Sequence, residues 1–158
     1  NRVYTQARDS ELRAHPWSFA RERVQVAADS TDPIFGAAKK YAIPADCLRI
    51  LPTNGTNASA VQDDWQIEGR FILTDDSSPI NLIYLKKITD ENTFDALFTE
   101  LLVARIAMDV AEKVTQSNKK KEDAVLHYSA TKKEARRINA FERPPQDLPQ
   151  DTWLEARL

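Results

Sequence analysis

The chain has 158 residues, enough for one compact domain or for a small domain with an extended arm. Its net charge of −2 gives no overall electrostatic case for nucleic-acid binding, and its single cysteine, Cys47, excludes an internal disulfide and fits a reducing compartment. The sequence has no uncharged apolar run of the length that spans a membrane.

The first residues of the chain read as the middle of a helix, and they begin at Asn1 without methionine. We therefore expect the natural N-terminus to lie upstream. The helical pattern must end near His15, because Pro16 disfavours helical geometry in the residue before it. Residues 17–20 then lead into a stretch in which Val24 and Val26 alternate with polar residues, which predicts a strand.

The middle of the chain predicts several short strands separated by turn-forming residues. Gly69-Arg70 is a tight step between two predicted strands and predicts a hairpin, and the sequence leaves the turn type open. Asn54-Gly55 is the clearest turn signal within a polar loop. The predicted strands cover residues 40–44, 47–51, 64–69, 71–74 and 79–88, with loops at 29–36 and 52–64.

The stretch from Asp90 to about Val114 predicts the central helix of the protein. Its apolar residues repeat at helical spacing over 94–102, and Asp90 is the expected N-cap. From Leu101 onward apolar residues cover more than one face, so we expect packing on several sides, within the fold or against neighbouring copies. Arg105 and Asp109 are one turn apart and are expected to pair.

A break at Ser117-Asn118 separates this helix from a second one, predicted from Lys119 to about Phe141. Its sparse apolar residues predict one narrow packed face. Between residues 119 and 143 there are eight Lys or Arg and four Asp or Glu. This basic helix either touches phosphates or, as we prefer, is a solvated face or a surface that pairs with an acidic neighbour.

These elements predict an α+β fold: a helical bundle with a small antiparallel β region inserted between N-terminal and C-terminal helices, and an extended C-terminal arm. One domain would cover residues 1–143, helical at 1–16 and 90–143 and β-rich at 17–88, with the arm at 144–158. The arm contains three prolines and has the apolar pair Trp153-Leu154 near its end. These two side chains must fold back onto their own domain or dock on another protein, and we favour docking. The expected partner-binding residues are Pro144, Pro145, Trp153, Leu154 and Arg157.

Sequence signatures of catalysis are absent. The glycines form no phosphate-binding loop, and His15 and His127 belong to no zinc motif. We interpret His15 as a helix-end residue whose ring bonds a carbonyl, His127 as solvated, and Cys47 as a small buried apolar residue. The sequence therefore predicts no enzyme, no cofactor and no metal site.

Two pairs of neighbouring acids keep one catalytic alternative open. Glycosidases use paired carboxylates, and Asp63-Asp64 and Asp75-Asp76 are the candidates for a tail-associated peptidoglycan hydrolase. Both pairs are expected in turns, where aspartate commonly bonds the backbone, so we prefer a structural role for them. A DNA-binding module that uses the basic helix 119–143 is the other alternative.

The order of several segments resembles tail tubular protein A, the head-to-tail adaptor family of short-tailed bacteriophages. The resemblance covers most of the chain from about Arg8, and it depends on the order and spacing of the segments together rather than on a single motif. The matching segments are HPWSFA at 15–20, YAIPADCLR at 41–49, WQIEGRFI at 65–72, Ile83-Tyr84, Thr89-Asp90, Phe94-Asp95, Leu97-Phe98, the helix with Ala104 to Ala111, and WLEAR at 153–157.

This resemblance implies a structural virion protein. Its members form a dodecameric ring under the portal protein ring, extend the DNA channel and present a platform for the tail nozzle protein. Genomic DNA would pass through the lumen without specific binding, and no membrane is involved. The protein would be assembled in the host cytoplasm and would reside at the head–tail junction of the virion. The family offers no catalytic residues, and its further N-terminal helix is missing from this sequence.

Overall fold

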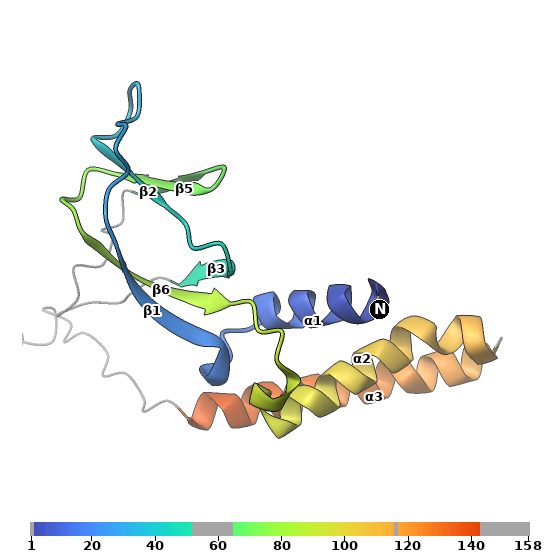
Figure 1. Cartoon of the computed structure of the whole chain (residues 1–158). Helices are drawn as coiled ribbons and strands as arrows, with labels where there is room; N and C mark the ends of the chain where they lie inside the picture. The colour runs from blue at the N-terminus through green and yellow to red at the C-terminus, as the bar shows by residue number, and fades with distance from the viewer. Residues whose placement is uncertain (1, 52–64, 116, 143–158) are drawn as a thin grey trace, which may run out of the picture.

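The computed structural model describes residues 2–51, 65–115 and 117–142. Within these residues the protein has an α+β fold with three helices and two three-stranded antiparallel sheets. The strands gather at one end of the molecule, and the helices extend from them as a separate layer (Figure 1). The predicted order, with a β region between an N-terminal helix and two C-terminal helices, is confirmed.

The N-terminal helix α1 spans Arg2–Ala14 and ends where Pro16 predicts. The short 3-10 helix η1 (Ser18–Ala20) then leads directly into the first strand. Trp17, between the two helices, is 1% exposed, and its Nε1 donates to the carbonyl oxygen of Glu11 at 2.9 Å. The indole therefore fills the core and satisfies a carbonyl at the C-terminal end of α1.

One sheet has the strand order β1-β6-β3 and the other β2-β5-β4. An isolated bridge between Ala28 and Tyr41 connects the end of β1 to β2. All the predicted strands are present, each close to its predicted range. Their bounds are β1 Arg21–Val26, β2 Lys39–Ala42, β3 Cys47–Leu51, β4 Gln66–Glu68, β5 Phe71–Thr74 and β6 Ile80–Lys86.

The two sheets share a small apolar core. Ile80 and Leu82 of the central strand β6 pack with Tyr41 of β2 and Ile72 of β5, and all four are buried. The alternation along β6 assigns these residues to one face, which is the period-2 pattern of a strand buried on that side. The β4–β5 hairpin turns at Gly69-Arg70, where Gly69 has a φ of +58°, a conformation that glycine adopts without steric cost.

Helix α2 spans Ala96–Thr115 and begins later than the sequence predicts. Asp90 does cap a helix, but it is the separate 3-10 turn η2 (Glu91–Thr93), where its side chain accepts from the backbone N–H of Asn92. The cap of α2 is Asp95, whose Oδ1 accepts from the N–H groups of Leu97 and Phe98 at 2.9 and 3.3 Å. The prediction was wrong because two aspartates five residues apart each have a capping side chain.

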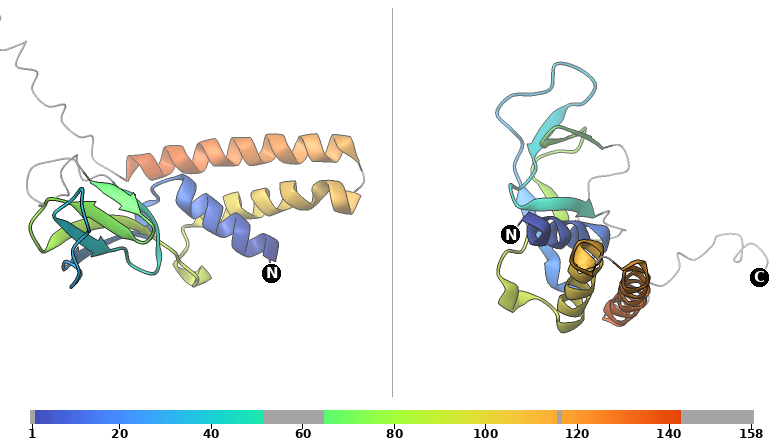
Figure 2. Two further views of the ribbon diagram at one scale, coloured as in Figure 1. Left: turned by 90° about the horizontal axis from the view of Figure 1, so that it is seen from above. Right: turned by 90° about the vertical axis from the view of Figure 1, so that its right-hand side faces the viewer.

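Helix α3 spans Asn118–Phe141 and is capped by Ser117, as the predicted break requires. It runs beside α2, and α1 packs against the same layer (Figure 2). An aromatic cluster fills the space where these helices meet the β region: the rings of Trp17 and Phe98 lie 5.2 Å apart in an edge-to-face arrangement. The predicted stripe of α2 is confirmed from Leu97 to Leu102, whereas Phe94 precedes the helix and packs against the same core from the end of η2.

Candidate functional site

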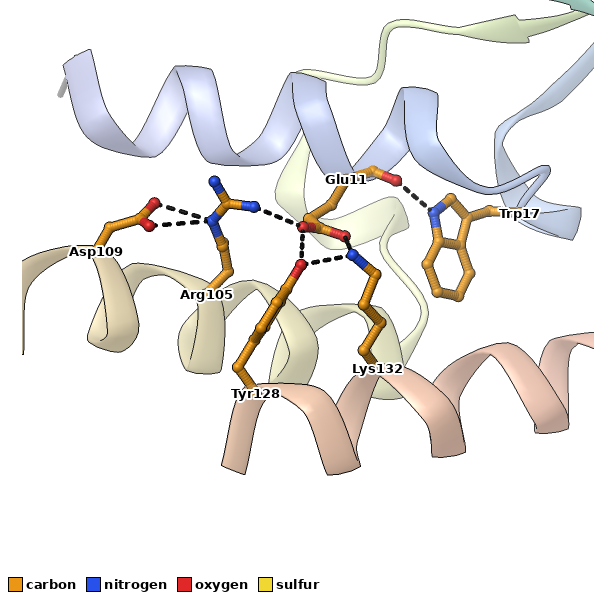
Figure 3. Close-up of polar contacts among 6 residues, drawn as sticks. All are labelled: Glu11, Trp17, Arg105, Asp109, Tyr128 and Lys132. Atoms are coloured by element: carbon orange, nitrogen blue, oxygen red, sulfur yellow. Dashed lines mark hydrogen bonds and ion pairs between the residues drawn. The ribbon is translucent and has the colours of Figure 1, made fainter. Parts of the chain in front are cut away.

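A buried carboxylate joins all three helices. The side chain of Glu11 on α1 is 2% exposed, and its Oε1 accepts hydrogen bonds from Tyr128 Oη at 2.5 Å and Arg105 Nη1 at 3.2 Å. Lys132 Nζ lies 3.6 Å from Oε2 and donates to Tyr128 Oη at 2.6 Å. Figure 3 shows these groups converging from α1, α2 and α3.

Arg105 bridges this cluster to a second acid. Its Nε bonds both carboxylate oxygens of Asp109, at 3.2 and 3.0 Å, which confirms the predicted pair on α2. The hydrogen bond to Asp109 is the main reason that the pKa of Arg105 is raised above its ordinary value. Arg105 therefore stays charged and shares its donors between Asp109 and Glu11.

The arrangement suits a structural role. Burying a carboxylate is costly unless opposite charges and donors surround it, and Glu11 has two cations and a hydroxyl. Two cavities among the described residues are lined by residues other than Glu11, so neither gives a substrate access to its carboxylate. One, of about 600 Å³, lies along α1 beside Leu48, and one, of about 570 Å³, lies at the start of α3 beside Leu126.

The candidate hydrolase acids Asp75 and Asp76 lie in the segment between β5 and β6 and bond the backbone there. Asp75 Oδ1 accepts from the backbone N–H of Ala38 at 2.7 Å, and the main chain of Asp76 bonds Thr74 and Tyr41. These are the turn contacts expected for aspartate. Asp63 and Asp64 lie outside the described residues.

The two histidines and the cysteine were the other residues considered for catalysis or metal binding. His15 Nε2 lies 2.9 Å from Nδ2 of Asn139, a contact that joins the end of α1 to α3. His127 is exposed, as predicted. Cys47 is half-buried, and burial raises the pKa of its thiol, which disfavours the reactive thiolate. No group of three or more potential metal ligands occurs among the described residues.

Some basic residues of α3 face the helical layer and others are exposed to solvent. Lys132 points toward Glu11 in the helical layer, so its charge is offset there. Lys119 and Lys120 are exposed at the start of the helix. The local positive excess counted in the sequence is therefore not one continuous face.

An apolar stripe on α2 faces away from the core. Val103 is 63% exposed and Val114 is 75% exposed, with Ala107 exposed and Val110 half-buried between them. The spacing of these residues places them on one side of the helix, roughly opposite to Phe98, Leu101 and Leu102. Apolar residues therefore lie on more than one face of this helix, and the expected packing of the outer face against neighbouring copies stays a prediction.

The five predicted partner-binding residues (Pro144, Pro145, Trp153, Leu154 and Arg157) lie outside the described residues, as does the boundary between domain and arm. The sequence analysis missed Glu11. A signal was present, because Glu11 follows Ala7 by one helical turn and precedes Leu12, which places a charge among buried positions.

Comparisons with known proteins give no assignment. No protein-family model matches the chain, and no curated protein matches it. None of the helices in the described ranges is both long and apolar enough to cross a lipid bilayer.

Proposed function

We propose that the chain is a structural head-to-tail adaptor of a short-tailed bacteriophage, whose copies form a ring that joins the portal to the tail nozzle and extends the DNA channel. The observation that carries this proposal is the outer apolar stripe of α2. Val103 and Val114 are largely exposed on a helix whose opposite face is already buried. Such a stripe is typical of a surface that another protein covers.

Contacts between copies would cover the stripe. Full burial of a valine side chain contributes about 1.5–3 kcal/mol relative to exposure, and each subunit of a ring repeats the contact with its neighbour. A ring needs a head-to-tail contact that closes, and two different apolar surfaces on one helical layer can provide it. The other surface would be formed by Val125 and Leu126 of α3, which are 43% and 67% exposed.

The proposed ring places the protein at the head–tail junction of the virion. Its partners there would be the portal protein ring and the tail nozzle protein, as the resemblance to the adaptor family implies. A net charge of −2 is consistent with a lumen through which genomic DNA slides without specific binding.

Electron microscopy of the protein mixed with the portal ring of the same phage tests the proposal. We expect the wild-type protein to form a ring stacked on the portal. The double variant Val103→Ser/Val114→Ser should lose the ring, because the stripe becomes polar. The matched control is Ile67→Ser, which changes a 51% exposed apolar residue on β4, away from the helices, and should keep the ring.

The outcomes separate two errors. A wild-type protein that never joins the portal contradicts the adaptor function itself. Ring formation by the double variant at wild-type yield would retain the function but reject the stripe of α2 as the contact between copies.

A further inference from the structure

The most exposed large apolar residues of the described chain are adjacent. Ile34 is 98% exposed and Phe35 is 85% exposed, in the loop between β1 and β2. Figure 1 shows this loop projecting from the end of the β region that lies farthest from the helical layer. We call the segment Pro33–Gly36 the apolar loop tip.

Hydrogen bonds hold the base of the loop. Asp29 Oδ1 accepts from the backbone N–H and the hydroxyl of Thr31, at 3.0 and 2.7 Å, and these bonds lower the pKa of Asp29. The N–H of Asp29 donates to the carbonyl oxygen of Lys40 at 2.8 Å, and Ala38 N–H donates to Asp75 at 2.7 Å. The two ends of the loop are thus fixed to β2 and to the segment after β5.

The backbone of the tip itself favours this presentation. Pro33 has a fixed φ, which limits the conformations available before Ile34. Gly36 has a φ of +88°, in the region that glycine adopts without strain, and it turns the chain back toward β2. A held base and a restricted tip reduce the conformational entropy that binding would cost.

The surroundings of the tip are acidic. Three aspartates (Asp29, Asp32 and Asp75) and two lysines (Lys39 and Lys40) lie in the loop, at the start of β2 and in the turn that holds Ala38, a formal charge of −1. Both lysines pair locally: Lys39 Nζ lies 2.9 Å from Asp32 and Lys40 Nζ lies 3.6 Å from Asp29. The formal charge at the base of the tip is therefore negative.

We propose that the apolar loop tip inserts into an apolar pocket on a partner protein, and that the pocket is edged by lysine or arginine side chains. Within the proposed function, on which this inference rests, the partner is the tail nozzle protein. The tip lies away from the helical layer that would form the ring, so it is available to a component beyond the ring. A phenylalanine and an isoleucine in one pocket would be the central anchors of the contact.

The acidic surroundings distinguish this partner from a membrane. Anionic lipid surfaces attract basic segments and repel acidic ones, so a lipid-inserting tip would be expected to have lysine or arginine at its base. A basic pocket edge on a protein is favoured by the same charges, which would also speed association at low salt.

The test measures the affinity of the portal-bound adaptor ring for the purified tail nozzle protein of the same phage. For Ile34→Ser/Phe35→Ser we expect an affinity loss on the order of tenfold to a hundredfold, because two anchor side chains are removed. The side chains are almost fully exposed, so the variant should keep the wild-type melting temperature. Ile67→Ser, the matched control on β4, should bind the nozzle protein as the wild type does.

A second variant tests the charge. Asp32→Lys reverses the charge beside the tip, and we expect slower association and a weaker dependence on salt concentration. Wild-type affinity of both variants for the nozzle protein overturns the inference while the adaptor function stands. Loss of the ring on the portal in Ile34→Ser/Phe35→Ser, or tip-dependent binding to vesicles of anionic phospholipid, also overturns it, because the tip would then contact a second copy or a membrane.

Discussion

The helical layer and the β region solve the problem of a small core in different ways. The helical layer places a charged cluster around Glu11 beside its aromatic core, whereas the shared core of the two sheets is built on apolar side chains and on Tyr41, whose hydroxyl bonds the carbonyl oxygen of Asp76. Strand register is specified by ladder hydrogen bonds and by alternation. Helices that slide by one turn still bury apolar surface, and we infer that Glu11 fixes their register.

The largest expected effect tests this contrast. Glu11→Ala leaves Arg105 and Lys132 without their shared anion and Tyr128 without its acceptor. We expect the free energy of unfolding to fall by about 3 kcal/mol, as for other broken buried pairs. Urea unfolding followed by circular dichroism measures it.

A matched control comes from the β region, where the exposed side chains of Glu22 and Lys86 form an ion pair, with Oε2 and Nζ 3.4 Å apart. Glu22→Ala should change stability by less than about 1 kcal/mol, because exposed pairs contribute little. If Glu11→Ala and Glu22→Ala lowered the free energy of unfolding equally, the buried position of Glu11 would add nothing to its contribution to stability.

A pH dependence is expected from the β region. Burial, with Asp46 as the next cause, raises the pKa of Tyr84 to about 12, above the value of about 10 in an unfolded chain. The neutral phenol is thus favoured by the fold. Its contribution is fully present below pH 10 and is lost as the pH rises toward 12, by up to about 2.7 kcal/mol for two pKa units.

Tyr84→Phe should remove that alkaline loss. At pH 8 the variant should be less stable than the wild type by about 1 kcal/mol or less, because the hydrogen bond to Asp46 at 3.2 Å is gone. Above pH 11 the order should reverse. A stability difference that stays constant between pH 8 and pH 11.5 contradicts the assignment.

The smallest effect compares the two capping aspartates. Asp95→Ala removes two hydrogen bonds to the first turn of α2 and should cost about 1 kcal/mol. Asp90→Ala affects only the short turn η2 and should cost less than about 0.5 kcal/mol. Thermal unfolding of both variants separates them, and a larger loss for Asp90→Ala would restore the cap that the sequence suggested.

The elements of the fold were predictable where the sequence has a period or a stop signal. Pro16 ends α1, Ser117 separates α2 from α3, and β6 lies within the predicted strand 79–88. The start of α2 was not, because Asp90 and Asp95 are both good capping residues and sequence spacing does not choose between them.

The functional surfaces were less predictable because they depend on what the fold leaves uncovered. The sequence indicates that α2 is apolar on more than one face, but only the packed chain shows that Val103 and Val114 are outside. Ile34 and Phe35 were visible as apolar residues in a polar loop, and their exposure required the loop geometry. Glu11 contacts residues of helices that are distant in the sequence, and a local sequence pattern cannot predict such contacts.

The contacts between α1 and α3 also constrain the order in which the protein can fold. Glu11 and Tyr128 are 117 residues apart, and Ser18 N–H bonds the side chain of Asn139, 121 residues away. During synthesis the first helix therefore waits for the last one to leave the ribosome before its buried carboxylate is neutralised by all of its partners. Such late long-range closure slows folding, because the entropy of closing a long loop is lost before these contacts can form.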